Sequence, residues 1–150
     1  LAVADVLLPN ETELAALLAR HTGDRIDADD VQGLDDDRLH RLCRTLLPRG
    51  TVVVTLGGAG AFVSHREDKR RGDEVDHYRV PAAPADVVDT TGAGDAFNGA
   101  LAASLAARPA LAFIEHVRFA GRYASRSTEQ AGAALSMPHL DVATANTDAG

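Results

Sequence analysis

Cysteine, lysine and long apolar runs are scarce in this 150-residue sequence. Cys43 is the only cysteine, which excludes a disulfide bond within the chain and a zinc site built from cysteines. The six histidines show no paired spacing typical of metal ligands. No apolar run approaches the roughly 18 residues of a membrane span, and no signal peptide opens the chain, so we expect a cytoplasmic protein without a membrane partner.

Positive charge is sparse as well. Lys69 is the single lysine beside fourteen arginines, and the net charge is −7. The only basic cluster, at residues 69–71, lies in a charged stretch that we interpret as a hairpin tip. A nucleic-acid-binding protein needs a basic face, so we expect no nucleic-acid partner. The length suits one domain with a single core.

The order of apolar segments indicates an α/β fold with a mainly parallel sheet and an antiparallel extension. Residues 1–8 and 51–56 are apolar runs without alternation, as expected for strands buried on both faces. Two shorter segments, 61–65 and 77–81, flank the charged tip as an antiparallel hairpin. The helices are predicted at residues 11–19, 36–47, 95–107 and 111–125.

The chain opens inside an apolar strand, and a buried parallel strand needs neighbouring strands and helices to cover it. We therefore expect the sequence to be the C-terminal part of a larger domain. That part is assigned to residues 1–142, and the small polar residues 143–150 are expected to form a flexible tail.

Three loops follow strand-like segments, at the edge of an α/β sheet where ligands bind. In the first loop, Asn10 and Glu13 fit a capping box, and they either only cap the next helix or also serve a site. The second loop, Gly57–Gly60, is either a plain hairpin turn or a ligand loop. For these two loops both interpretations stay open.

The third loop, Thr90–Asp95, contains more than a helix cap requires. Gly92 and Gly94 clear side chains from two backbone positions, so N–H groups at the helix start can approach an anion. The loop is not a Walker A motif, because no Gly-Lys-Ser/Thr ends it, and Phe97 stands where a dinucleotide fingerprint needs its third glycine. A carboxylate repels a nearby phosphate unless it has a second purpose, such as removing a proton from an attacking hydroxyl. Asp95 is therefore predicted to be a general base at an anion-binding helix start.

The sequence around this loop, "DTTGAGDAFNGAL", resembles the C-terminal signature of the ribokinase-type (phosphofructokinase-B-type) carbohydrate kinases. The resemblance continues through "LLPNETE", "VVVTLGGAGAFV" and "RFAGRYASRSTEQAGAALSMP", in the family's order and at comparable spacings. It implies a ribokinase-like three-layer α/β/α fold, of which this chain is the C-terminal part. The family's N-terminal half, which carries most sugar contacts and a β-lid, has no counterpart in the sequence.

The resemblance implies roles in catalysis and nucleotide binding. Asp95 matches the catalytic base that deprotonates the sugar hydroxyl. The anion hole for the transferring phosphoryl group corresponds to Gly92, Ala93 and Gly94. Asn10 and Glu13 match an Asn-x-x-Glu motif associated with the placement of Mg²⁺ and phosphate. The positions implied to contact ATP are Thr55, Leu56, Gly57, Gly58, Ala59, Gly60, Gly94 and Gly121.

The resemblance also implies a monovalent cation, usually K⁺, which would steady the loop carrying the anion hole. Its ligands would be the Asp89 carboxylate, backbone carbonyls and one hydroxyl. The matching positions are Asp89, Thr91, Ser127, Gln130, Gly132 and Ser136. The family pattern Gly-Ala-Gln-Pro-Ser reads Gly-Ala-Ala-Leu-Ser here, at residues 132–136.

The activity implied is ATP-dependent phosphorylation of a sugar hydroxyl, with D-ribose giving ribose 5-phosphate. The partners implied are a small sugar, ATP and, through the family's lid, a second copy of the full-length protein. Two alternatives stay open: a kinase for another sugar or a nucleoside (fructose, 2-keto-3-deoxygluconate or adenosine), and a truncated, non-catalytic nucleotide-binding module. The chain alone is expected to be inactive, because the sugar contacts are missing.

Overall fold

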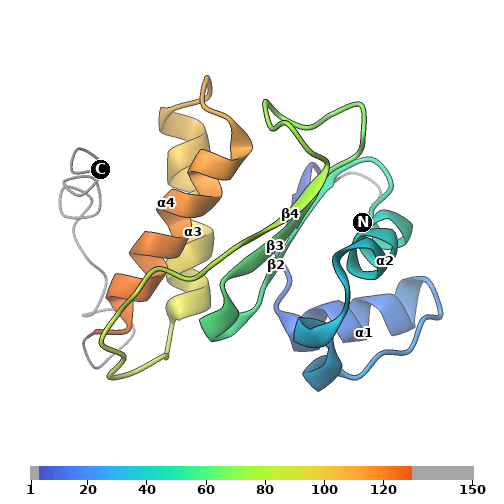
Figure 1. The fold of residues 1–150 in the computed structure, drawn as a ribbon, viewed down its shortest axis with the longest axis horizontal. Coiled ribbons are helices and arrows are strands. Elements are labelled where there is room, and N and C mark those ends of the chain that lie inside the picture. The colour runs from blue at the N-terminus through green and yellow to red at the C-terminus, as the bar shows by residue number, and fades with distance from the viewer. Residues whose placement is uncertain (1–3, 130–150) are drawn as a thin grey trace. The chain divides into compact units, whose positions relative to one another are not determined.

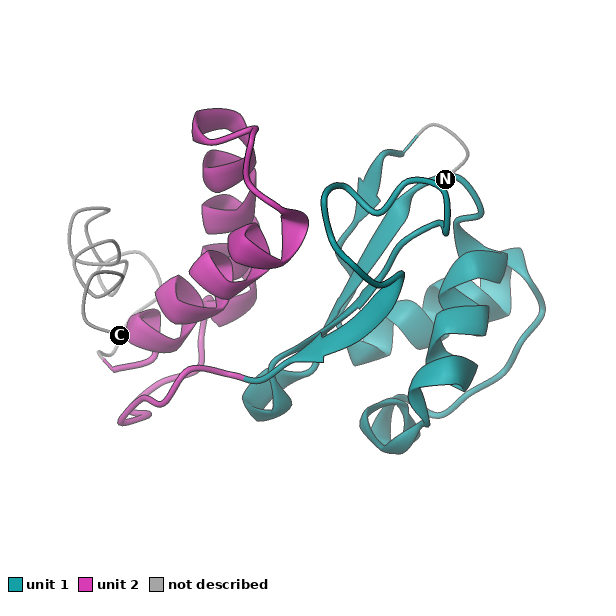
Figure 2. Ribbon diagram, turned by 45° about the horizontal axis from the view of Figure 1, so that its top comes forward, with its two compact units in different colours: residues 1–81 teal, residues 82–150 magenta. Residues whose placement is uncertain are grey.

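The computed structural model describes residues 4–129 and divides the chain into two compact units, at residues 1–81 and 82–150 (Figure 2). We describe each unit by itself. The first unit contains a sheet, two α-helices and two short 3₁₀ helices, and the second contains a pair of α-helices. Within the described residues no helix is both long and apolar enough to cross a membrane.

The first unit is built on a four-stranded sheet with the strands in chain order. The strands are β1 (Val6–Leu7), β2 (Thr51–Thr55), β3 (Ala61–Ser64) and β4 (His77–Val80). β1 and β2 are parallel, and both remaining pairs are antiparallel. The central strand β2 is β-branched throughout, which suits a pleated, buried surface. The parallel pair and its antiparallel extension are therefore confirmed in this unit.

Two helices of this unit begin at the predicted caps. Helix α1 (Glu11–His21) starts after Asn10, and α2 (Asp36–Leu46) starts after Asp35, whose carboxylate accepts the Arg38 N–H at 2.8 Å. The connection between them contains a 3₁₀ helix, η1 (Ala28–Gly33), which the apolar pattern does not indicate. Asp27 caps η1 by accepting the Asp29 N–H, so the start of this turn depends on a local side-chain contact.

The core of the first unit lies between the sheet and the helices. In Figure 1, α1 and α2 lie on the same side of the strands. Their buried residues pack with alternate side chains of the strands, as the period-2 geometry of a strand requires. The cluster includes Leu14, Leu18, Leu39, Cys43, Val52, Val54 and Phe62. Both helices are thus held against one face of the sheet.

Cys43 is fully buried in this core, and burial raises the pKa of its thiol to about 12. The thiolate is the reactive form of cysteine, so the folded chain should react slowly with a thiol reagent at pH 8. We expect the chain in denaturant to react at the rate of a free cysteine and the native chain at least about 100-fold more slowly. A time course with Ellman's reagent checks this, and similar rates in both states would contradict the burial of Cys43.

The second unit is a helical hairpin in which α3 (Ala93–Ala107) and α4 (Phe113–Ser127) lie side by side (Figures 1 and 2). Its buried apolar residues come from both helices, and the Ser104 hydroxyl lies 2.8 Å from Nδ1 of buried His116. Helix α3 starts two residues earlier than predicted, because Gly92 rather than a side chain provides its N-cap. Helix α4 is shifted by two residues from the predicted span.

Two apolar segments differ from the expected strands. β1 comprises two half-buried residues, and in the described part of the chain it pairs only with β2. Val87 and Val88, at the end of a strand-like segment, form no strand, and their side chains are 63% and 66% exposed. Apolar residues alone do not form a strand, because a strand needs a neighbouring strand to pair with its backbone N–H and C=O groups.

Candidate functional site

In the first unit, two of the three predicted loops meet at the carboxyl end of the parallel pair. The N–H of Thr55 donates to the carbonyl of Pro9 at 2.9 Å, and Asn10 forms a parallel bridge with Thr55. The last residue of β2 is therefore tied to the start of α1. This contact brings the Asn-x-x-Glu segment and the loop at residues 55–60 to one edge of the sheet.

Asn10 and Glu13 form a complete capping box at this edge. The Asn10 side chain accepts the Glu13 N–H at 2.9 Å, and Oε2 of Glu13 accepts the Asn10 N–H at 3.0 Å. Both residues are exposed. The capping interpretation is thus confirmed, and it leaves a fixed carboxylate and a fixed amide facing solvent. Their proposed relation to Mg²⁺ and phosphate stays a prediction.

The loop at residues 55–60 is a tight turn with an accessible backbone. Its middle forms a short 3₁₀ helix, η2 (Gly57–Ala59), between the end of β2 and the start of β3. Gly57 and Gly60 have φ values of 52° and 93°, which glycine adopts without the strain that other residues incur. Buried Leu56 anchors the turn, and its N–H donates to the Gly60 carbonyl at 2.8 Å. A Cβ atom at Gly57 or Gly58 would meet nothing within 4 Å, so a ligand could approach the backbone here.

The third predicted loop belongs to the second unit and ends at the start of α3. The Asp89 carboxylate accepts the Thr91 N–H at 2.8 Å, and Gly92 follows in the left-handed conformation with φ 80°. The carbonyl of Gly92 accepts the first helical hydrogen bond, from Ala96 at 2.8 Å. Gly92 is therefore the N-cap of α3, and among residues 4–129 no side chain caps this helix with a hydrogen bond.

The first turn of α3 presents free donors beside a free carboxylate. The Ala93 N–H donates to the Thr90 carbonyl at 3.2 Å. Among residues 4–129, the N–H groups of Gly94 and Asp95 have no hydrogen-bond partner, and neither has the Asp95 carboxylate. Asp95 is exposed and is the third residue of the helix, so it is not the N-cap. A helix N-terminus with free N–H groups attracts anions, and a free carboxylate can accept a proton.

The same loop is attached to the end of α4. The N–H groups of Val88 and Asp89 donate to the carbonyl of Thr128, at 2.7 and 3.0 Å. Thr128 follows Ser127, so the structure brings two predicted cation-ligand positions, Asp89 and Ser127, into the same region. Oxygen ligands of this kind suit a monovalent cation. The sequence pattern did not single out Thr128, because a backbone carbonyl leaves no signal in residue type.

Of the remaining predicted positions, the structure describes only one. Gly121 lies in α4, where a Cβ atom would meet nothing within 4 Å. The predicted cation ligands Gln130, Gly132 and Ser136 lie outside the described residues.

A family model described as "pfkB family carbohydrate kinase" matches residues 1–140. The chain belongs to this family. Among pfkB-family relatives, it is 33% identical over 144 residues to a bifunctional ribokinase/ribose-5-phosphate isomerase A of Fructilactobacillus sanfranciscensis, covering 92% of the chain and 22% of the relative. It is 32% identical over 140 residues to the ribokinase of Haemophilus influenzae, covering 92% and 39%. Fructokinase-1 of Zea mays is 31% identical over 140 residues, covering 90% of the chain and 37% of the relative. The chain thus spans at most about two fifths of these relatives.

Solved structures of the pfkB family have the same fold. Ribokinase from Thermotoga maritima superposes with a TM-score of 0.70 at 27% identity, covering 93% of the chain and 40% of that structure. Arabidopsis thaliana ribokinase complexed with ribose and ATP gives 0.60 at 31% identity, covering 89% and 38%. Phosphofructokinase-2 of Escherichia coli in complex with potassium gives 0.62 at 27% identity, covering 88% and 37%. The predicted ribokinase-like α/β fold class is confirmed.

Proposed function

We propose that this chain is the ATP-binding and catalytic-base part of a sugar kinase that acts on D-ribose to give ribose 5-phosphate. The observation that carries the proposal is the start of α3, where two N–H groups and an exposed carboxylate that have no hydrogen-bond partner within residues 4–129 follow a glycine loop. An anion cradle with a base beside it is what phosphoryl transfer to a hydroxyl requires.

In the proposed reaction Asp95 accepts the proton of the sugar hydroxyl as its oxygen attacks the γ-phosphorus of ATP. The new O–P bond forms as the bond between the γ-phosphorus and the bridging oxygen breaks, and ADP leaves with the electron pair. Gly92, Ala93 and Gly94 form the anion hole, in which backbone N–H groups face the charge that develops on the phosphoryl oxygens. The absence of Cβ atoms at Gly92 and Gly94 lets these oxygens approach.

In the first unit, the positions proposed to contact the nucleotide are those of the loop at residues 55–60; in the second unit they are Gly94 and Gly121. The accessible backbone at Thr55–Gly60 supports this, and so does the ATP bound by the related Arabidopsis ribokinase. ATP is accompanied by Mg²⁺, and Asn10 and Glu13 would orient this ion through bridging water molecules, because both side chains are fixed and exposed. Mg²⁺ supplies charge neutralisation of the phosphates when it is bound.

We also propose an activating K⁺ ion near Asp89. The contact of the Asp89 backbone with the end of α4 supports this, as does the potassium in the related Escherichia coli phosphofructokinase-2. The site would be completed by the carbonyls and hydroxyl predicted at Thr91, Ser127 and residues 130–136. A cation in this place would hold the loop that carries the anion hole.

The sugar contacts, the lid and any homodimer interface would belong to a part of the protein outside this chain. Residues 1–142 would form the C-terminal part of the kinase domain, and 143–150 a tail. The similarity to maize fructokinase-1 keeps a fructose kinase as a second candidate. A kinase for 2-keto-3-deoxygluconate or a nucleoside, and a non-catalytic nucleotide-binding module, are the remaining alternatives.

A coupled ADP-release assay tests the proposal. We expect the 150-residue chain to bind ATP weakly and to show no sugar-dependent turnover, because most sugar contacts are missing. The full-length protein should release ADP with ribose faster than with fructose, and faster in K⁺ than in a bulky organic cation. Turnover by the chain alone near the enzyme median of about 10 s⁻¹ would contradict its assignment as a part. A full-length protein inactive on every sugar and nucleoside would contradict the kinase proposal.

A further inference from the structure

A second cluster of chemically reactive side chains lies in the first unit, away from the loops described above. His40, Asp76 and His77 each offer one ligand atom within 4.8 Å of the others. His77 pairs with Ser64 and Ser64 with Val52, so the cluster lies near the start of β2. The Gly57–Gly60 turn follows the opposite end of the same strand. The cluster is therefore separate from the proposed nucleotide loops.

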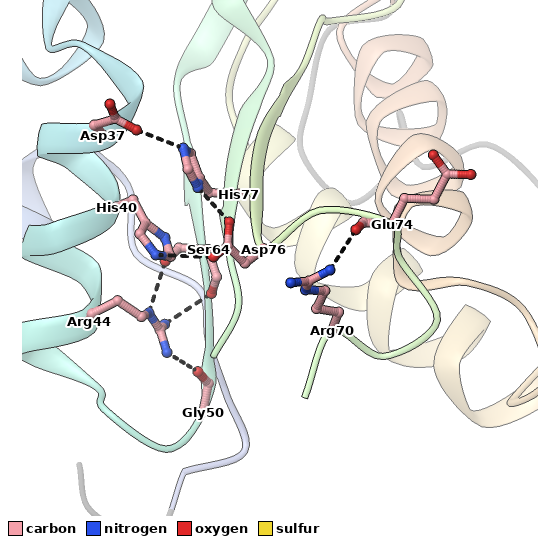
Figure 3. A network of polar contacts seen from close by, with 9 residues as sticks. All are labelled: Asp37, His40, Arg44, Gly50, Ser64, Arg70, Glu74, Asp76 and His77. Carbon is pink, nitrogen blue, oxygen red and sulfur yellow. Dashed lines mark hydrogen bonds and ion pairs between the residues drawn. The ribbon is translucent and has the colours of Figure 1, made fainter. Parts of the chain in front are cut away.

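The three side chains are brought together by packing of α2 on the antiparallel hairpin (Figure 3). His40 follows the buried core residue Leu39 on α2, and His77 is the first residue of β4 with Asp76 before it. The imidazole rings of the two histidines stack with centroids 4.4 Å apart. Since 36 residues separate His40 from Asp76, no sequence spacing indicates the cluster.

The outer nitrogen of each imidazole already faces an orienting partner. Nδ1 of His40 lies 2.9 Å from the Ser64 hydroxyl, which also accepts Nε–H of Arg44 at 3.0 Å. Nε2 of His77 lies 3.3 Å from Oδ1 of Asp37. Such contacts fix the tautomer and orientation of metal-binding histidines in general. The remaining nitrogens, Nε2 of His40 and Nδ1 of His77, are then directed toward Asp76.

The inner atoms of the cluster converge on the Asp76 carboxylate. Nε2 of His40 is 3.9 Å from Oδ2 of Asp76, too far for a hydrogen bond. Nδ1 of His77 is 2.7 Å from Oδ1 of the same carboxylate. A neutral His77 carries one ring hydrogen, yet both its nitrogens face carboxylates, of Asp76 and Asp37. Nδ1 of His77 and Oδ1 of Asp76 are hydrogen-bonded, and a cation between the inner atoms would replace this bond and leave the ring hydrogen of His77 on Nε2, facing Asp37.

We propose that His40, Asp76 and His77 form a binding site for a divalent transition metal of the zinc class, with Asp37 as the carboxylate that orients His77. Two imidazoles and one carboxylate suit Zn²⁺ and not Mg²⁺ or Ca²⁺, which prefer oxygen ligands alone. The side chains are 17%, 29% and 24% exposed, so an ion can enter and water can complete the coordination.

Of the two distances between a histidine nitrogen and an Asp76 oxygen, one is shorter and one is longer than tetrahedral zinc coordination requires. Bonds of about 2.0–2.2 Å at tetrahedral angles put ligand atoms about 3.3–3.5 Å apart, whereas the two pairs here are 2.7 and 3.9 Å apart. The rings are inclined by only 25°, and one metal cannot lie in both planes at that angle. His77 must therefore turn about its Cβ–Cγ bond, a torsion with a broad range. The Asp37 side chain, which is 78% exposed, must follow Nε2 of His77 to remain its partner in the bound state. The bound ion would then join α2 to β4.

The affinity of the full chain for Zn²⁺, measured by competition with a chromophoric chelator, tests the site. We expect one bound ion per chain, and a rise in the melting temperature with added Zn²⁺. His40→Gln and His77→Gln should each weaken binding by more than about 100-fold, and Asp37→Asn by about 10–100-fold, as for other outer partners. His21→Gln is the matched control, because His21 is exposed at the end of α1 and should leave binding unchanged.

A measurement on the unaltered chain covers the case in which a variant fails to fold. In ¹⁵N-correlated NMR spectra of the histidine rings, one equivalent of Zn²⁺ should shift the nitrogens of His40 and His77 and leave those of His21 in place. Unchanged His40 and His77 signals at saturating Zn²⁺ would overturn the proposal, since they would show a cluster that takes only protons. Equal affinity of the His40→Gln variant and the unaltered chain would overturn it as well.

Discussion

Replacing Asp95 by asparagine should lower the kcat of the full-length protein in the proposed reaction by about 10²–10⁴-fold. This corresponds to about 3–5 kcal/mol of transition-state stabilisation. The amide cannot accept the proton of the attacking hydroxyl, although its size and position are those of the carboxylate. The affinity for ATP should hold or increase slightly, because one negative charge beside the γ-phosphate is removed.

The structure makes the Asp95→Asn experiment decisive. Gly92 is the N-cap of α3, and the Asp95 carboxylate has no hydrogen-bond partner within residues 4–129. Its contribution to the described part of the chain is a negative charge in the first helical turn, worth under about 1 kcal/mol. The melting temperature should therefore change little while kcat falls. A variant with nearly normal kcat would refute the role of Asp95 as base. Glu115→Gln is a control for the loss of a first-turn carboxylate on α4, where the change also removes the ion pair with Arg118 at 2.7 Å.

The substitution Gly94→Ala should also lower activity, while the stability of the variant stays the same or increases. Gly94 has no positive φ, and a Cβ atom there would meet nothing within 4 Å. Because alanine restricts the unfolded chain more than glycine does, the variant should be as stable as the parent or more stable by up to about 1 kcal/mol. The open space beside Gly94 is where the phosphoryl oxygens would lie, so a methyl group should displace them. A misplacement of about 1 Å can cost about 10²-fold in rate.

Paired measurements of unfolding and of kcat on the Gly94→Ala variant check this expectation. Gly99→Ala is the matched control, because Gly99 lies further along α3 and a Cβ atom there also meets nothing within 4 Å. It should gain similar stability without losing activity. If Gly94→Ala retained full kcat, the free N–H groups at the start of α3 would not form the anion hole.

Local signals in the sequence predicted the elements that local interactions build. Asn10 with Glu13, and Asp35 before α2, are caps whose side chains bind the backbone three residues away, so spacing alone identifies them. The strand at residues 51–55 was predicted for a similar reason, since a β-branched apolar run has few other places in a fold.

Features that depend on distant partners were not predictable in this way. Val87 and Val88 resemble the end of a strand, but the N–H groups of Val88 and Asp89 donate to the Thr128 carbonyl at the end of α4. The grouping of His40 with His77 depends on how α2 packs on the hairpin, which residue spacing does not encode. Of the candidate site, the glycine loop and its carboxylate were predictable, and the contacts that orient them were not.

The hydrogen bond from Thr55 to Pro9 and the capping box at Asn10 have a thermodynamic consequence for ligand binding. They order two adjacent loops during folding, before any ligand arrives. Ordering one mobile side chain on binding costs about 0.5–1.5 kcal/mol. Because these loops are ordered already, this cost would not reduce the binding free energy of the nucleotide. Such preorganisation predicts that the heat-capacity change on binding an ATP analogue, measured by calorimetry, is little larger than the change expected from the apolar area that the ligand covers.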